Sequence, residues 1–290
     1  MGSGRRLATP ATAIAVGTFA LAGCGLGGHS GTASAPRRIV PGHNHMALTI
    51  GAPPSTQGGL LAQVYAQALG AAGYRARVVR GLAGADAWPA SIRGTQRDFR
   101  SRLSRRGLVA LAPAAARLGL GIAIGKATAR THGIQTLSEL LGSGRRVRIS
   151  GPRGCARDPQ CLPALRHTYG LRRVQEVRPD LVQDDLRSAR ADAVIVPTID
   201  PHLSRAGEQL LEDDRQALPS HGVTLVVRAG IAQAAGKGLA DAVAAAGSRL
   251  TNPTLAELLA RVSFDELPAA VVARQYLRAA RLVGGGRSAL

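Results

Sequence analysis

Short apolar runs alternate with segments of helical periodicity along most of the chain, which predicts an α/β fold. Ala47 to Gly51 has the pattern of a buried strand. In the next segment, Gly59 to Leu69, apolar residues recur at i, i+1, i+4 and i+5, and Ser55 or Thr56 is the expected N-cap. Arg75 to Val79 is predicted as a second strand. Together they predict a strand, helix and strand with parallel pairing.

The alternation continues to about residue 196, and the end of the chain is predicted to be helical. From Ala232 to Leu282 the pattern is helical throughout, with Thr251 and Asn252 opening one helix ahead of Pro253. About 245 residues lie beyond the N-terminal region, enough for one large domain or two lobes with separate cores. The other predicted strands are Val109–Ala112, Leu120–Ile124, Val147–Ser150, Val174–Val177 and Ala193–Val196, and the other helices are Lys126–His132, Thr136–Leu141, Cys161–Tyr169 and Leu181–Ala189.

The N-terminus has the order of a bacterial lipoprotein signal: two arginines, an apolar run and small residues before a cysteine. The run from Ala11 to Ala22 is too short to span a bilayer, for which about 20 apolar residues are needed. Because Leu21-Ala22-Gly23-Cys24 resembles a lipobox, residues 1–23 are predicted to be removed and Cys24 to be acylated. The alternative is an ordinary signal peptide with a chance cysteine. Residues 24–45 are predicted as a flexible tether, which would anchor an extracytoplasmic domain to the outer face of the cell membrane.

The excess of positive charge favours anionic neighbours. The chain has 37 lysines and arginines against 18 aspartates and glutamates, a formal net charge of +19. Nucleic acid is not predicted as a partner, because an exported protein meets little of it and aromatic residues, at 3%, offer few stacking platforms. Anionic lipid headgroups and wall polymers fit better. Nearly all the cations are arginines, which also fits a coding bias and a solvated basic surface.

The two other cysteines, Cys155 and Cys161, predict a disulfide. In an oxidising compartment a C-x5-C pair is expected to be bridged. A metal site is the alternative, but Asp158 alone does not supply the further ligands that it would need. No metal and no cofactor are predicted.

The strand pattern nominates three loops as a ligand site. In open α/β sheets a ligand binds beyond the carboxyl ends of the strands, where helix N-termini offer free N–H groups. The segments in that position are Ala52–Gln57, Gly151–Arg153 and Pro197–Asp200.

Six segments, in order, resemble the substrate-binding proteins of osmoprotectant ABC importers, which bind glycine betaine, choline and carnitine. The resemblance extends over most of residues 46–282, and its specific parts are Gly-Pro to Cys-Leu-Pro after residue 150 and Leu-Glu-Asp-Asp after residue 210. The segments are Leu48–Gly51, Leu61–Tyr74, Arg106–Pro113, Gly151–Leu165, Tyr169–Leu171 and Leu211–Asp214.

The resemblance implies a type II periplasmic-binding-protein-like fold, with two α/β lobes that close over the ligand. Two crossing strands would join the lobes, near Pro113 and near Pro219 to Val223. Lobe I would then consist of residues 46–112 and 222–290, and lobe II of residues 113–221.

This chain departs from the family at the aromatic box that holds a quaternary ammonium. The family's Pro-Glu-Tyr-Thr-Gly-Thr is replaced by Pro89–Thr95, its Tyr-Ser-Thr-Asp by Val196–Asp200, and its Tyr-Asn by His221-Gly222. Trp88, in the predicted site loop, is the one aromatic residue left as a platform. Core packing is predicted instead for Tyr65, Tyr74, Tyr169 and Tyr276.

Arg153 is predicted to clamp a carboxylate by paired hydrogen bonds, with a solvated loop arginine as the alternative. Cap, turn or surface roles are the alternatives for the other candidates. The predicted ligand-binding residues are Thr56, Gln57, Trp88, Arg153, Thr198, Asp200 and His221.

No enzyme is predicted. The chain has no Gly-x-Ser-x-Gly elbow, Walker loop, His-Glu-x-x-His or Gly-x-Gly-x-x-Gly motif. His43 and His45 lie in the flexible lead-in as a chance pair, and Glu212, Asp213 and Asp214 have no recognisable base or metal partner.

The predicted function is that of a monomeric, lipid-anchored solute-binding component of an ABC importer. It would capture a small polar solute of the osmoprotectant or quaternary-amine class and deliver it to the permease subunits. The alternative is a divergent, non-transporting envelope interaction or sensory lipoprotein with the same fold. A basic binder of wall polymers or lipid surfaces is a third hypothesis, which rests on charge alone.

Overall fold

The computed structural model describes residues 38–42, 45–142, 146–205 and 207–283. By its contacts the chain separates into two units, Met1–Ala35 and Pro36–Leu290, and all the described residues belong to the second unit. This unit contains its own hydrophobic cores. The predicted signal peptide and Cys24 lie outside the described residues. Among the described helices, none has the length and apolar character needed to cross a membrane.

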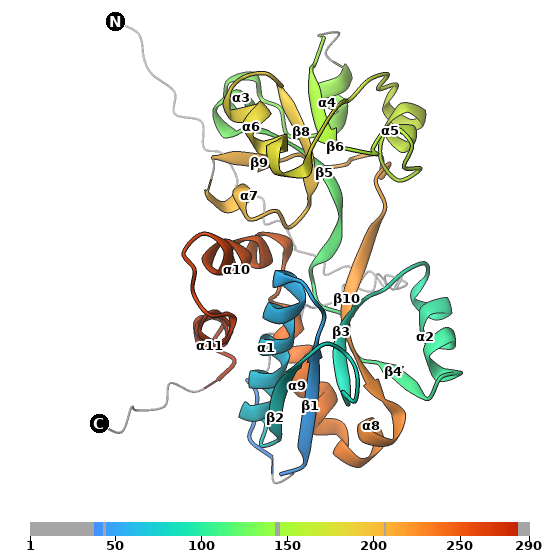
Figure 1. The fold of residues 1–290 in the computed structure, drawn as a ribbon, viewed down its shortest axis with the longest axis vertical. Coiled ribbons are helices and arrows are strands. Elements are labelled where there is room, and N and C mark those ends of the chain that lie inside the picture. The colour runs from blue at the N-terminus through green and yellow to red at the C-terminus, as the bar shows by residue number, and fades with distance from the viewer. Residues whose placement is uncertain (1–37, 43–44, 143–145, 206, 284–290) are drawn as a thin grey trace, which may run out of the picture. The chain divides into compact units, whose positions relative to one another are not determined.

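The strands form one connected sheet, in the order β2-β1-β3-β10-β5-β8-β6-β7, with β4 paired to β10 and β9 to β5 (Figure 1). Parallel pairing joins β1 to β2 and β3, and joins β6 to β7 and β8. The strands are β1 Ala47–Ala52, β2 Arg75–Arg80, β3 Ala87–Ser91, β4 Leu108–Ala110, β5 Arg117–Gly125, β6 Ile149–Pro152, β7 Gln175–Val177, β8 Ala193–Pro197, β9 Glu208–Leu210 and β10 Ser220–Arg228.

The first core is built around helix α1 (Thr56–Ala71), which connects the parallel strands β1 and β2 as predicted. Its predicted N-cap is confirmed, since the Ser55 side chain accepts a hydrogen bond from the N–H of Gly58 at 3.0 Å. Buried residues of β1, α1 and the C-terminal helices, such as Ile50, Tyr65 and Val243, form one cluster. The C-terminal helices are α8 Ala229–Ala235, α9 Lys237–Ser248, α10 Asn252–Ser263 and α11 Ala269–Ala279.

A separate core lies on the other half of the sheet. Its buried residues come from β5, β6, β8 and the helices between them, and include Ile122, Leu165 and Ile195. The helices of this half are α3 Lys126–His132, α4 Leu137–Gly142, α5 Leu162–Tyr169, α6 Val182–Arg187 and α7 His202–Arg205, with a 3-10 turn at Pro179–Leu181.

Strands β5 and β10 run from one core to the other and pair where they cross. Ser220 lies opposite Gly119, and Gly222 opposite Arg117. A Cβ at Gly119 would lie 2.6 Å from the Pro219 carbonyl oxygen, so the close approach of the two strands requires glycine. The sequence places the first crossing near Pro113, whereas the strand that makes it begins at Arg117.

Several elements differ from the sequence predictions. Residues Ala87 to Ser91 form strand β3 rather than a loop, and the helix α2 (Gln96–Ser104) was not predicted. The fold also begins before residue 46, inside the predicted tether. Within that segment, the N–H of Ile39 donates to Leu282 and the N–H of Gly42 donates to Ala72.

Candidate ligand-binding site

The carboxyl ends of the parallel strands in both halves of the sheet face the crossing of β5 and β10. In the first half, β1 and β3 run parallel, and β3 ends at Ser91 opposite Val223, next to the crossing pair. In the second half, β8 ends at Pro197 opposite Leu120, and β6 runs parallel to β8. The loops that follow β1, β6 and β8 therefore leave the sheet on the sides that face the crossing. These are the three loops that the sequence nominates.

Thr56 and Gln57 occupy the first turn of α1, directly after β1. Thr56 is exposed and Gln57 half-buried. The Ser55 cap accepts from only one of the unpaired N–H groups of this turn. The remaining N–H groups give the turn the donors and the positive potential that suit a carboxylate.

Arg153 follows β6 and is exposed. Its backbone N–H donates to the Val177 carbonyl at 2.9 Å, which fixes the residue beside β7. Its guanidinium has no ion pair or hydrogen bond with another of the described residues. The side chain is thus held at the strand end and is available to an anionic group.

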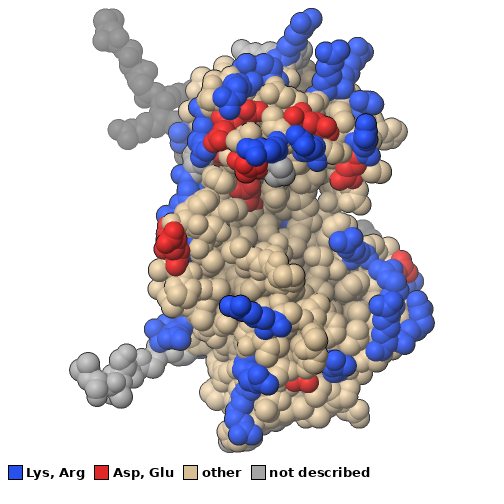
Figure 2. Space-filling model, in the orientation of Figure 1, with Lys and Arg blue, Asp and Glu red and all other residues tan. Residues whose placement is uncertain are grey.

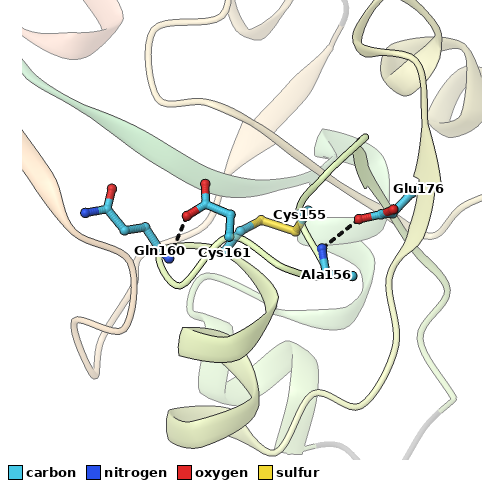
Figure 3. The surroundings of a disulfide bond; sticks show 6 residues. Cys155, Ala156, Gln160, Cys161 and Glu176 are labelled. Atoms are coloured by element: carbon cyan, nitrogen blue, oxygen red, sulfur yellow. Dashed lines mark hydrogen bonds between the residues drawn. A yellow bond between two sulfur atoms is a disulfide. The ribbon is translucent and has the colours of Figure 1, made fainter.

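A disulfide between Cys155 and Cys161 closes the loop after Arg153, as the spacing predicts (Figure 3). Both cysteines are buried in the second core. The loop is further held by a hydrogen bond from the N–H of Ala156 to Oε1 of Glu176, at 2.6 Å. The bridge and this bond restrict the loop that carries Arg153.

Thr198 helps to fasten the crossing strands. Its N–H donates to the Gly119 carbonyl and its Oγ1 to the Arg117 carbonyl, each at 2.9 Å. Asn252, the first residue of α10, donates from Nδ2 to the Arg117 carbonyl at 2.7 Å and accepts from the Arg117 N–H at 2.8 Å. The Arg117 guanidinium donates to Oγ of Ser220 at 2.9 Å. The Thr198 hydroxyl is therefore committed to the backbone.

The sequence did not identify three residues that bond at the crossing: Arg117, Ser220 and Asn252. The Thr-Asn-Pro start of α10 was predicted as a helix start, and Thr251 does cap it. That signal identifies a helix start, but it does not reveal that Asn252 bonds to a residue 135 positions away.

Replacing Asn252 with alanine is expected to lower the free energy of unfolding by about 1 to 2 kcal/mol. The substitution removes both hydrogen bonds between the Asn252 side chain and the Arg117 backbone. Urea unfolding followed by circular dichroism measures this change. Asn252→Asp keeps the acceptor for the Arg117 N–H but places a carboxylate oxygen against the Arg117 carbonyl, so it should not restore the stability of the wild type. Equal stability of the alanine variant and the wild type would contradict the role of this contact.

Asp200 bonds within its own turn. Its Oδ1 accepts from the His202 N–H at 2.9 Å and lies 2.8 Å from His202 Nδ1. The His202 ring packs on Phe264, with 4.8 Å between centroids. The Asp200 charge also acts on Glu208, a buried residue of β9: burial raises the pKa of Glu208, and the charge of Asp200 raises it further. Asp200 thus positions α7, and its Oδ2 makes no hydrogen bond within the described part of the chain.

Trp88 and His221 do not lie together. Trp88 is opposite Val226 in the pairing of β3 with β10, five residues along β10 from His221. At about 3.4 Å per residue this separates them by about 17 Å. The predicted loop position of Trp88 is wrong, because it lies inside β3 on the face opposite to the buried Ala87. His221 is half-buried in the crossing, opposite Leu118.

Three of the four tyrosines, Tyr65, Tyr74 and Tyr276, are buried in the first core. Tyr65 is fully buried, and the hydroxyls of Tyr74 and Tyr276 donate to the carbonyls of Ala235 and Ala246. Burial raises the pKa of all three phenols. These three side chains thus belong to the core.

Tyr169 and the acidic segment after Leu211 form a structural contact in the second half. The Tyr169 hydroxyl donates to Oδ1 of Asp213 at 2.6 Å, and Asp213 also accepts from the N–H groups of Ala217 and Leu218. Two of the three carboxylates of this segment, Asp213 and Asp214, therefore bond to Tyr169 at the end of α5.

Two surface cavities, of about 910 and 650 Å³, lie on the second half. Both are lined by Arg146 and Val147, and none of the seven predicted ligand-binding residues lines either of them. Within the described ranges no group of three or more His, Cys, Asp or Glu side chains could hold a metal ion. The candidate site is therefore assigned from the strand ends at the crossing and not from a cavity.

One family model matches most of this chain. The family model described as the substrate binding domain of an ABC-type glycine betaine transport system matches residues 47–279. No curated protein sequence matches this chain.

Similar solved structures share the fold at low sequence identity. Apo YehZ from Escherichia coli is 18% identical with a TM-score of 0.71, over 80% of this chain and 98% of that one. A glycine betaine/carnitine/choline ABC transporter protein is 13% identical with a TM-score of 0.69, over 80% and 98%. Lactococcal OpuAC, closed on glycine betaine, is 10% identical with a TM-score of 0.50, over 81% and 96%. The predicted two-lobed α/β fold, of the type II periplasmic-binding-protein kind, is confirmed.

Proposed function

Since this chain belongs to the family of substrate-binding domains of ABC-type glycine betaine transport systems, we propose that it captures a small zwitterionic or quaternary-amine solute at the crossing of β5 and β10. Its role is that of a solute-binding component of an ABC importer. Proteins of this family bind small solutes and work with membrane permeases. The family match does not favour a non-transporting role.

The observation that carries the proposal is the convergence of strand ends. The loops after β1, β6 and β8 leave the sheet on the sides that face the crossing, and they or the helix start that follows contain Thr56, Gln57, Arg153, Thr198 and Asp200. Ligands of open α/β sheets bind at such strand ends. No chemistry beyond binding and release is needed, so we propose no enzymatic activity.

The first turn of α1 and the Arg153 side chain would bind the carboxylate of the solute. Free N–H groups and a guanidinium both favour negative charge. For the cationic end, the Oδ2 of Asp200 provides a carboxylate oxygen and His221 a half-buried ring. Trp88 lies about 17 Å from His221 along β10 and contributes only if the solute extends that far. The site would thus rely on charge where an aromatic box uses ring faces.

We further propose two lobes, 46–112 with 222–290 and 113–221, which close over the solute by bending at the crossing. Ile39 and Gly42, just before residue 46, bond to the first of them. The protein would act as a monomer held outside the cell membrane by a lipid on Cys24.

Thermal unfolding of residues 36–290 with a panel of solutes tests the proposal. A ligand that binds only the folded state raises the unfolding midpoint, by the equivalent of about 2.7 kcal/mol at 100 times its Kd. Glycine betaine or a related zwitterion is expected to raise it, whereas glycerol, an uncharged osmolyte of similar size, is the control. No shift with any betaine, choline, carnitine or amino acid would contradict the proposal.

A further inference from the structure

Residues 93–106, here called the basic segment, carry a charge that the function above does not use. The segment has six arginines and one acidic residue, Asp98. Figure 2 shows Lys and Arg side chains gathered over α2, which lies in this segment at an edge of the fold. The arginines are Arg93, Arg97, Arg100, Arg102, Arg105 and Arg106.

The basic segment is exposed and its charge is uncompensated. Helix α2 has no buried residue. Its one carboxylate, Asp98, accepts a hydrogen bond from the Thr95 hydroxyl at 2.7 Å. None of the six arginines forms an ion pair with any of the described residues, unlike Arg148, which pairs with Asp192 at 2.8 Å.

Local contacts nevertheless give this helix a fixed shape. The Thr95 side chain caps α2 by accepting from the Asp98 N–H at 3.1 Å, and the Arg102 guanidinium donates to the Arg93 carbonyl at 2.7 Å. Phe99 and Leu103, four residues apart, are half-buried, so they form the inner side of the helix. The exposed arginines are thus displayed on a preformed surface.

We propose that the basic segment binds the phosphate headgroups of an anionic phospholipid membrane. Guanidinium groups form paired hydrogen bonds with phosphate, and a protruding helix with cations spread along it matches a flat charged surface. The six arginines are all exposed and spread over 14 residues, which suits an extended array of phosphates better than a single small anion. Nucleic acid is disfavoured because the one aromatic ring, Phe99, lies on the inner side.

The test is co-sedimentation of residues 36–290 with vesicles of phosphatidylglycerol and phosphatidylcholine in equal parts, at about 0.1 M salt. The variant R97Q/R100Q/R105Q is expected to bind at least about tenfold more weakly, since each arginine near an anionic surface contributes roughly fivefold. Vesicles of phosphatidylcholine alone should bind neither protein.

A matched control, R130Q/R172Q/R173Q, removes the same charge from exposed positions on the other half of the sheet and should change binding less than about twofold. R97K/R100K/R105K, which keeps the charge, should still bind. Equal losses in the two glutamine variants, or no loss in the first, would overturn the proposal. The proposal is independent of solute binding, which the glutamine variants should retain.

Discussion

Replacing Arg153 with glutamine is expected to weaken the binding of glycine betaine by about 10- to 100-fold. A charge-assisted pair with a carboxylate contributes about 1.5 to 3 kcal/mol. Arg153 stands at the end of β6, with its backbone bonded to Val177 and its guanidinium unpaired within the described part of the chain. Isothermal titration calorimetry of wild type and variant measures the change.

Choline provides the matched ligand for this experiment, because it has the ammonium group of glycine betaine but no carboxylate. Its affinity should be nearly unchanged in Arg153→Gln. Arg157→Gln is the matched variant: Arg157 is an exposed arginine four residues further on, inside the disulfide-closed loop that follows Arg153. If Arg153→Gln weakened choline and glycine betaine equally, Arg153 would not be the carboxylate contact.

The parts of the fold that the sequence predicted are those with local signals. The periodicity of α1, the Ser55 cap and the parallel pairing of β1 with β2 all follow from residues close in sequence. The same holds for the three strand-end loops, because strand ends are visible as the ends of apolar runs. The candidate site could therefore be located to these loops.

Strand β3 was missed because Pro89 lies in its centre, and proline inside a run argues against a strand. The structure tolerates Pro89 because β3 pairs with β10 along its length but with β1 at only one position, Ile50 opposite Ala87. Helix α2 was missed for another reason. Only Phe99 and Leu103 give it apolar periodicity, and its start depends on the Thr95 cap.

The contacts at the crossing could not be predicted, because they join residues far apart in the sequence. Asn252 and Arg117 are separated by 135 positions, and Thr198 and Arg117 by 81. Thr198 was selected as a ligand residue because of its place after a strand. The structure shows that its hydroxyl bonds to a backbone carbonyl instead, which leaves less of the predicted site free for the solute than the sequence suggests.

Replacing Asp185 with alanine is expected to lower the free energy of unfolding by about 3 kcal/mol. Asp185 is only 3% exposed and connects α6 to β6, since its Oδ2 accepts from the Ser150 hydroxyl at 2.6 Å. Its Oδ1 accepts from Nε of Arg190 at 2.8 Å. The substitution leaves the fully buried Ser150 hydroxyl without this acceptor and the Arg190 charge unpaired. Urea unfolding at pH 7 measures the loss.

Asp192→Asn is the control for this variant, because Asp192 forms an ion pair with Arg148 in which the side chains are 43% and 59% exposed. Its loss should be less than about 1 kcal/mol. If the two variants lost equal stability, the buried position of Asp185 would not be the reason for its contribution.

The contribution of Asp185 should also depend on pH. The hydrogen bonds from Ser150 and then Arg190 hold the pKa of its carboxyl below the usual range. A carboxyl whose pKa is lower in the folded state contributes stability above its unfolded pKa, about 3.9, and loses it as the pH falls toward the folded value. The difference between wild type and Asp185→Asn should therefore be full at pH 7 and shrink below about pH 4. A difference that stayed constant down to acid pH would mean that the charge of Asp185 is not what stabilises the fold.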